Sequence, residues 1–156
     1  VAPPEEAGGR TIVVGYGRVG SQLAQLLKER GVPVVVIEDD ADRVVQARAS
    51  GFPTVRGNVA NRRVMQEAAP ERANLAIFAM PQALEAGEAI ERLKALNPAL
   101  SVLARAHSEA QVKHLLEHGA DAAVLAEREL AYSLTEMVMA TPPYRALRAT
   151  TVPAAG

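Results

Sequence analysis

A strand, a glycine-rich turn and a helix follow one another near the start of this chain, and this order restricts the fold more than any other feature. The apolar run Thr11–Val14 predicts a strand covered on both faces, and Gly15-Tyr-Gly-Arg-Val-Gly20 follows it directly. In such a turn Gly15 permits the sharp bend, Gly17 lets the backbone approach a pyrophosphate, and Gly20 lets the helix pack closely on the strand. We therefore predict a nucleotide site at the N-terminus of this helix; the alternative is a tight turn that binds nothing.

The second predicted strand, Val34–Glu38, ends in an acidic residue at the position where a carboxylate accepts hydrogen bonds from both hydroxyls of a ribose. Asp39 and Asp40 follow it. A 2′-phosphate here would meet like charge, and two unit charges about 4 Å apart repel by roughly 4 kcal/mol at an effective dielectric constant near 20. The acids therefore favour NAD(H), or AMP, ADP or ATP, over NADP(H).

Apolar strand candidates alternate with helices along the whole chain. Three strands follow a glycine that ends the preceding helix, at Gly31, Gly51 and Gly119, and two more are Leu75–Ala79 and Ser101–Arg105. Alternation of this kind predicts an α/β fold with right-handed crossovers. We expect a Rossmann-like, doubly wound, six-stranded parallel sheet in the order 3-2-1-4-5-6.

Ligands of such sheets bind over the carboxyl ends of the strands, beside the first strand, where the strand order reverses. This edge collects the glycine turn, the end of the second strand, the turn after the third strand and the end of the fourth. Asn58 either contacts the ribose or base, or only stabilises its turn. The predicted binding residues are Gly15, Tyr16, Gly17, Arg18, Val19, Gly20, Glu38, Asp39, Asn58, Val59, Ala79 and Met80.

Two arginines and a histidine near this edge allow more than one interpretation. Arg18 either reaches the phosphates or is an ordinary exposed helix arginine. Arg105 closes the fifth strand at the ligand edge, and His107 lies just beyond it. Either residue contacts a ligand or a partner, or takes part in ion pairing at the edge of the core.

The apolar pattern of the helices predicts which faces are buried. In the helix after the first strand, four residues at i, i+4, i+7 and i+8 form a stripe that we assign to the core: Val19, Leu23, Leu26 and Leu27. His114 and His118 are spaced i, i+4 beside Glu117, which is a spacing that can hold a metal. Because the helix is amphipathic and the histidines lie off its Leu115 face, we expect a solvated face and no metal.

The composition argues against several function classes. The absence of cysteine excludes disulfides, thiol catalysis and thiolate metal ligands. A net charge of −1 and 3% aromatic residues provide neither a basic face nor stacking platforms, so we expect no nucleic-acid partner. Neither a Tyr-x-x-x-Lys pair nor a Gly-x-Ser-x-Gly elbow is present, and the residues after the sixth strand are too few for a substrate domain. We therefore expect no catalytic residues and no enzyme; the alternative is a fragment of an NAD-dependent oxidoreductase without its substrate domain.

We divide the chain into a flexible linker at residues 1–9, the nucleotide-binding domain at 10–126, and a helix with a C-terminal tail at 127–156. The first residues are rich in Pro, Ala, Glu and Gly, and the chain begins with Val-Ala-Pro-Pro rather than Met. We therefore expect a segment of a longer protein, joined to a preceding domain by this linker.

Several motifs together resemble a known family. They are Val14-Gly-Tyr-Gly-Arg-Val-Gly20, the acid at Glu38, Arg56-Gly-Asn58, Val102-Leu-Ala-Arg-Ala-His107 and Glu127-Arg-Glu-Leu-Ala131. They are similar to the regulator-of-potassium-conductance domain (RCK/KTN, or TrkA N-terminal domain), especially the cytosolic domain of bacterial Kef-type potassium/proton antiporters. The resemblance covers residues 10 to 140. One departure is Asn58, where the family often has aspartate.

The resemblance implies a regulatory domain that binds NAD(H) or an adenine nucleotide (AMP, ADP or ATP) and controls ion flux. It implies a homodimer through the helix near residues 127–140, a membrane transport domain in the same parent chain, and a place at the cytoplasmic face of the inner membrane. A glutathione-responsive site is also implied, without residues to place it. Leu130, Leu134, Met137 and Val138 form the apolar stripe expected of the dimer helix, although such a stripe also fits packing on the sheet of the same chain.

Overall fold

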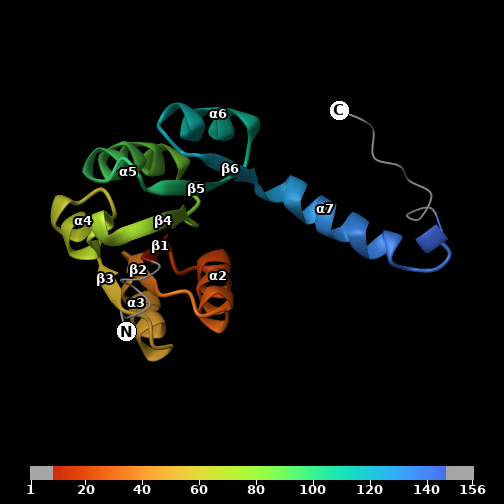
Figure 1. Cartoon of the computed structure of the whole chain (residues 1–156), viewed down its shortest axis with the longest axis horizontal. Helices are drawn as coiled ribbons and strands as arrows, with labels where there is room; N and C mark the ends of the chain where they lie inside the picture. The colour runs from red at the N-terminus through yellow and green to blue at the C-terminus, as the bar shows by residue number, and fades with distance from the viewer. Residues whose placement is uncertain (1–8, 147–156) are drawn as a thin grey trace.

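The computed structural model describes residues 9–146 (Figure 1). In chain order the elements are β1 (Arg10–Val14), α2 (Arg18–Glu29), β2 (Val34–Glu38), α3 (Ala41–Ala49), β3 (Thr54–Arg56), α4 (Arg62–Ala68), the 3-10 turn η1 (Pro70–Arg72), β4 (Ala73–Phe78), α5 (Ala83–Leu96), β5 (Ser101–Ala106), α6 (Glu109–Glu117), β6 (Ala122–Leu125) and α7 (Ala126–Met139). The strands form one parallel sheet in the order β3-β2-β1-β4-β5-β6, which confirms the predicted topology. Apart from Gly9, the expected linker lies outside the described residues, as does the tail beyond residue 146.

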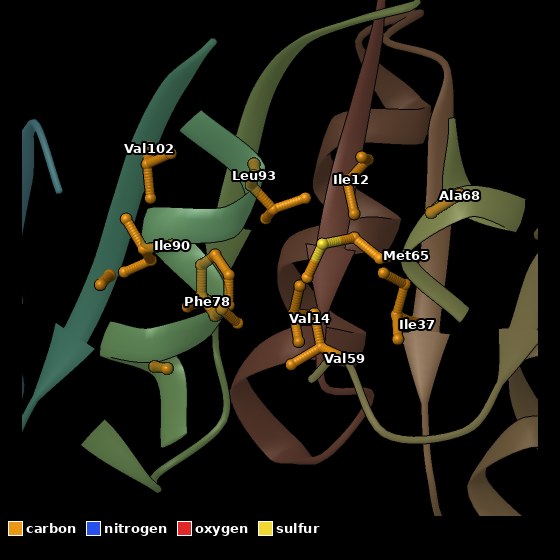
Figure 2. Close-up of a cluster of buried hydrophobic side chains, with 14 of the residues drawn as sticks. Ile12, Val14, Ile37, Val59, Met65, Ala68, Phe78, Ile90, Leu93 and Val102 are labelled. Carbon is orange, nitrogen blue, oxygen red and sulfur yellow. The ribbon is translucent and has the colours of Figure 1, made fainter. Parts of the chain in front are cut away.

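The main core lies between the sheet and the helices α4, α5 and α6. Strand residues that point to this face, such as Ile12, Ile37 and Phe78, join helix residues such as Ile90 and Leu93 in one buried cluster. Figure 2 shows these side chains lying together from β2 across β1 to β5. Because successive strand residues point to opposite faces, β1 and β2 contribute their alternate residues to a smaller cluster beneath α2 and α3.

The face that α2 and α3 cover remains open over β4, β5 and β6. Among the described residues, the buried cluster beneath α2 and α3 contains none from these three strands. The side chains of Leu75, Ile77 and Leu103 on this face are only partly buried, and Val124 is 42% exposed. We call this surface, formed by Leu75, Ile77, Leu103, Arg105 and Val124, the open half-sheet.

Helix α7 leaves the sheet directly after β6 and does not fold back onto it (Figure 1). None of its residues is buried, and the apolar stripe of Leu130, Leu134, Met137 and Val138 is exposed, with Met137 at 67%. The alternative in which this stripe packs on the sheet of its own chain is therefore wrong. Within residues 9–146, no helix is both long enough and apolar enough to cross a bilayer.

The buried face of α2 differs from the predicted stripe. Leu23 and Leu27 pack against the smaller cluster, but Val19 and Leu26 are 43% and 55% exposed. The buried positions of the helix are the small residues Gly20 and Ala24, which lie one turn apart. Small residues bring the helix close to the sheet and rotate the contact towards themselves, so the assignment of Val19 and Leu26 to the core is wrong.

His114 and His118 lie between α5 and α6 instead of on a solvated face. Their rings are in contact, with centroids 4.1 Å apart and planes tilted by 40°, and His118 Nδ1 lies 2.8 Å from the carbonyl oxygen of His114. A Cβ at Gly87 of α5 would lie 2.6 Å from His114 Nε2, so the glycine makes room for the imidazoles. The expectation of a solvated face is therefore wrong. No cluster of three or more His, Cys, Asp or Glu residues suited to a metal ion occurs in the described part of the chain.

Candidate functional site

A cavity of about 360 Å³ opens at the carboxyl ends of the first three strands, next to the turn between β4 and α5. Its volume falls in the range of ordinary ligand pockets. Predicted residues that line it are Gly15, Glu38, Asp39, Asn58, Val59 and Met80; the others are Val14, Ile37, Arg43, Gly57, Pro81, Gln82 and Glu85. Apolar strand ends therefore form part of the wall, and carboxylates, amides and one guanidinium form the rest.

The glycine turn beside the cavity shows why two of its three glycines are required by the protein itself. Gly15 has φ +100°, and a Cβ there would lie 3.1 Å from the backbone nitrogen of Met80. A Cβ at Gly20 would lie 1.7 Å from the carbonyl oxygen of Gly15, which excludes any side chain. Both glycines are thus explained by the turn and by the close approach of α2.

Gly17 has no such explanation within the described residues. Its φ is −82°, which every residue adopts, and the nearest atoms to a Cβ there belong to the Arg43 side chain, 3.7 Å away. Gly17 is also the N-cap of α2, and no side chain caps this helix end. Uncapped N–H groups and the positive end of the helix dipole favour an anion. The backbone at Gly17 is therefore open to close approach by another group.

Glu38 holds together the backbone around the cavity. Its side chain is 7% exposed, and its two carboxylate oxygens accept hydrogen bonds from the backbone N–H groups of Tyr16 and Asp40, each at 2.7 Å. A carboxylate has about four acceptor sites, so two remain for a ligand. The carboxylate therefore ties the glycine turn to the end of β2, a structural role that the sequence did not indicate.

Arg43 is a site residue that the sequence interpretation missed. Asp40 caps α3 by accepting a hydrogen bond from the Arg43 backbone N–H at 3.0 Å, and this fixes the first turn of the helix. The Arg43 side chain then lies over Gly17 and lines the cavity. The available signal was an arginine three residues after the N-cap Asp40, on the helix that follows Glu38. Gln82 and Glu85, at the start of α5, were missed as well.

The remaining predicted residues take different places. Tyr16 is buried against Phe52, with ring centroids 5.9 Å apart, so only its backbone faces the site. Asn58 does form the turn that we considered: its Oδ1 accepts a hydrogen bond from the backbone N–H of Ala60 at 2.8 Å, and the residue also lines the cavity. Arg18 and Val19 are exposed at the start of α2. Ala79 is buried behind the glycine turn, where a Cβ at Gly20 would meet its Cβ at 3.4 Å.

The sequence matches the TrkA-N domain family over residues 11–126. Among curated proteins, a putative cation/proton antiporter, YbaL of Escherichia coli K12, is 40% identical over 140 residues, which are 90% of this chain and 25% of that protein. Another is K(+) efflux antiporter 1 of Arabidopsis thaliana, at 30% identity over 85% of this chain and 11% of the relative. The chain thus spans about a quarter or less of the length of these relatives.

Solved structures share the fold. The crystal structure of the TrkA-N domain of the inner membrane protein ybaL from Escherichia coli is 41% identical, with a TM-score of 0.77, and the match covers 82% of this chain and 95% of that one. A Kef C-terminal domain from Shewanella denitrificans in its AMP-bound form has a TM-score of 0.73 at 21% identity, over 90% of this chain and 87% of that one. A GsuK channel bound to NAD has a TM-score of 0.67 at 18% identity, over 74% of this chain and 21% of that one.

Proposed function

The chain belongs to the TrkA-N domain family, and from this we propose that it is a nucleotide-sensing regulatory domain of a potassium (monovalent cation) transporter or potassium/proton antiporter. In this role the chain performs no catalysis. It binds an adenine nucleotide or NAD(H) at the carboxyl edge of the sheet, and the bound ligand changes ion flux through a membrane domain of the same parent chain. The domain then works at the cytoplasmic face of the inner membrane. Its similarity to part of larger cation antiporters supports this assignment.

Gly17 is the observation that carries the nucleotide proposal. No atom of the described residues lies close enough to exclude a side chain there, while the uncapped end of α2 and the Arg43 guanidinium both favour a phosphate at this point. The free acceptor sites of Glu38 suit the two hydroxyls of a ribose on the other side of the cavity. The proposed phosphate site and the proposed ribose site are thus neighbours in the cavity, as the phosphate and the ribose are in an adenosine phosphate.

The acids around the ribose site favour ligands without a 2′-phosphate. Glu38 and Asp39 both line the cavity, so a 2′-phosphate would add negative charge beside two carboxylates. We propose AMP, ADP, ATP or NAD(H) as the ligand class. The Kef domain bound to AMP and the GsuK channel bound to NAD, which share this fold, are consistent with that class.

We further propose a homodimer through α7. The apolar stripe of α7 is exposed, and the open half-sheet is partly exposed and apolar except for Arg105; α7 does not cover the half-sheet of its own chain. A second copy of the chain would cover both surfaces, because a two-fold axis lets each α7 contact the other protomer. Exposed apolar side chains buried in this way stabilise the pair by about 25 cal/mol per Å².

The test is the melting temperature of this chain with AMP, ADP, ATP, NAD⁺, NADH and NADPH. A ligand at about 100 times its dissociation constant stabilises by about 2.7 kcal/mol, which is roughly 5–11 °C for a domain of this size. We expect a rise with at least one nucleotide and none with NADPH. Gly17→Val should remove the rise, whereas Ala49→Val, on an exposed position of α3, should leave it unchanged. A chain whose melting temperature responds to none of these ligands would refute the nucleotide site.

A further inference from the structure

Arg105 carries a charge that the described residues do not balance. The side chain is half-buried near the end of β5, and its Nη1 donates one long hydrogen bond, 3.3 Å, to the carbonyl oxygen of Ala79. Its Nε is buried and has no hydrogen-bond partner. No carboxylate within residues 9–146 lies within 4.0 Å of the guanidinium, although other cations of the domain form ion pairs. A guanidinium has five N–H donors and a permanent charge, so this arrangement leaves most of its capacity for an anion.

The position of Arg105 relative to the glycine turn is fixed by the sheet. Phe78 is in register with Ala104, so Arg105 lies beside Ala79, on the face that α2 covers at β1. The Ala79 N–H donates to the carbonyl oxygen of Val14 at 2.9 Å, and its Cβ adjoins the site of Gly20. In the strand order β2-β1-β4-β5, the glycine turn therefore lies between Glu38 on one side and Arg105 on the other.

We propose that Arg105 is a second anion-binding residue, which recognises the part of the nucleotide beyond the first phosphate. A doubly wound sheet has two mononucleotide-binding halves, one on each side of the point where the strand order reverses. Glu38 belongs to the first half, and the N-terminus of α2 takes the first phosphate. A ligand longer than AMP continues past β1 towards β4 and β5, where the guanidinium meets its next negative group. This inference rests on the proposed nucleotide site.

The proposal assigns a preference within the ligand class. ADP and ATP bring a phosphate to Arg105, whereas AMP ends at the glycine turn. NAD⁺ brings a positively charged nicotinamide ring to the same half, and NADH brings a neutral one. The chain should therefore bind ADP more tightly than AMP, and NADH more tightly than NAD⁺.

Isothermal titration of this chain with AMP and ADP tests the inference, because the two ligands differ only in the second phosphate. In Arg105→Gln we expect ADP affinity to fall by about tenfold or more, the range of a hydrogen bond to a charged group, while AMP affinity changes less than twofold. The preference for NADH over NAD⁺ should shrink in the same variant. Arg105→Lys, which keeps the charge, should retain part of the ADP affinity. The matched control is Arg48→Gln: its Nη2 also donates one hydrogen bond to a backbone carbonyl, that of Thr54 at 3.2 Å, but at the opposite edge of the sheet.

Three outcomes would overturn the inference while leaving the nucleotide site intact. They are an equal loss of AMP and ADP affinity in Arg105→Gln, no loss of either, or a changed monomer–dimer equilibrium with an unchanged ratio of ADP to AMP affinity. The last result would assign the guanidinium to a contact between copies. Failure of the wild-type chain to bind any nucleotide would refute the proposed function itself. The melting temperature of each ligand-free variant separates loss of binding from loss of folding.

Discussion

Glu38→Gln should destabilise the ligand-free protein, in addition to any effect on binding. The carboxylate accepts two backbone N–H groups at 2.7 Å while only 7% exposed, one from Tyr16 and one from Asp40. A glutamine has one oxygen and one NH₂ group, so one of the two donors would face another donor. A hydrogen bond to a charged group contributes about 1.5–3 kcal/mol, and a buried donor without a partner costs about 1–3 kcal/mol. We expect the free energy of unfolding to fall by about 2–4 kcal/mol. This is less than the sum of the two ranges, because the loss of one hydrogen bond and the cost of its unpaired donor partly describe the same change.

Urea unfolding and thermal melting without nucleotide measure this loss. For a domain of this size, each kcal/mol corresponds to about 2–4 °C in melting temperature. The matched control is Asp39→Asn, which removes the same charge from the next residue. Asp39 also lines the cavity, but it is exposed and its side chain makes no hydrogen bond within residues 9–146. Its free energy of unfolding should therefore change by less than about 0.5 kcal/mol. Equal stability losses in the two variants, or none in either, would refute the role of Glu38 as the tie between the glycine turn and β2.

Three further predictions concern other parts of the fold. Gly20→Ala should severely destabilise or prevent folding, because its Cβ would lie 1.7 Å from a carbonyl oxygen, whereas Gly17→Ala should keep the fold and weaken nucleotide binding; circular dichroism and titration separate the two. The hydrogen bond from Lys94 at 2.8 Å and then a backbone N–H lower the pKa of Asp121, so its contribution to stability is present above the unfolded-state pKa and is lost as the pH falls through the folded-state value. In Asp121→Asn the free energy of unfolding should therefore fall less steeply as the pH is lowered through the acidic range. The same dependence on pH as in the wild-type chain would contradict this. Leu134→Glu should shift the chain to monomer in analytical ultracentrifugation while its circular dichroism spectrum stays that of the folded domain, because the side chain is 53% exposed in its own chain and lies on a helix with no buried residue.

Much of the fold follows from local signals. The apolar runs, the glycines that end helices and the strict alternation of strands and helices predict a parallel sheet with right-handed crossovers, and the glycine-rich turn after the first strand selects the order 3-2-1-4-5-6. The same reasoning identifies the carboxyl edge of the sheet as the site before any coordinates are known. Gly15 and Glu38 line the cavity there because both lie at strand ends, and the spacing along the chain gives strand ends directly.

The parts that the sequence did not give depend on how elements approach one another. Val19 and Leu26 look buried by periodicity, yet Gly20 and Ala24 set the contact of α2 with the sheet. His114 and His118 look solvated, yet a single glycine on another helix makes room for them. Arg43 lines the cavity because its side chain extends from the first turn of α3 to Gly17. The two histidines depend on a glycine distant in sequence, and the buried face of α2 depends on how closely the helix approaches the strand before it. A periodic pattern within one helix contains neither.

In the proposed dimer, the open half-sheet would connect the nucleotide site to the partner protomer. Arg105 lies on it between the glycine turn and Val124 of β6, and α7 starts directly after that strand. Two dimer arrangements that cover the open half-sheet to different extents would bind such a ligand with different affinities. The ligand shifts the equilibrium between the two arrangements only through this difference in affinity. The coupling is reciprocal: if the dimer binds ADP tenfold more tightly than the monomer does at each site, ADP must tighten the dimer correspondingly, by about 1.4 kcal/mol per site. A dimer dissociation constant that is the same with and without saturating ADP would mean that the ligand does not act through the dimer contact, however tightly it binds.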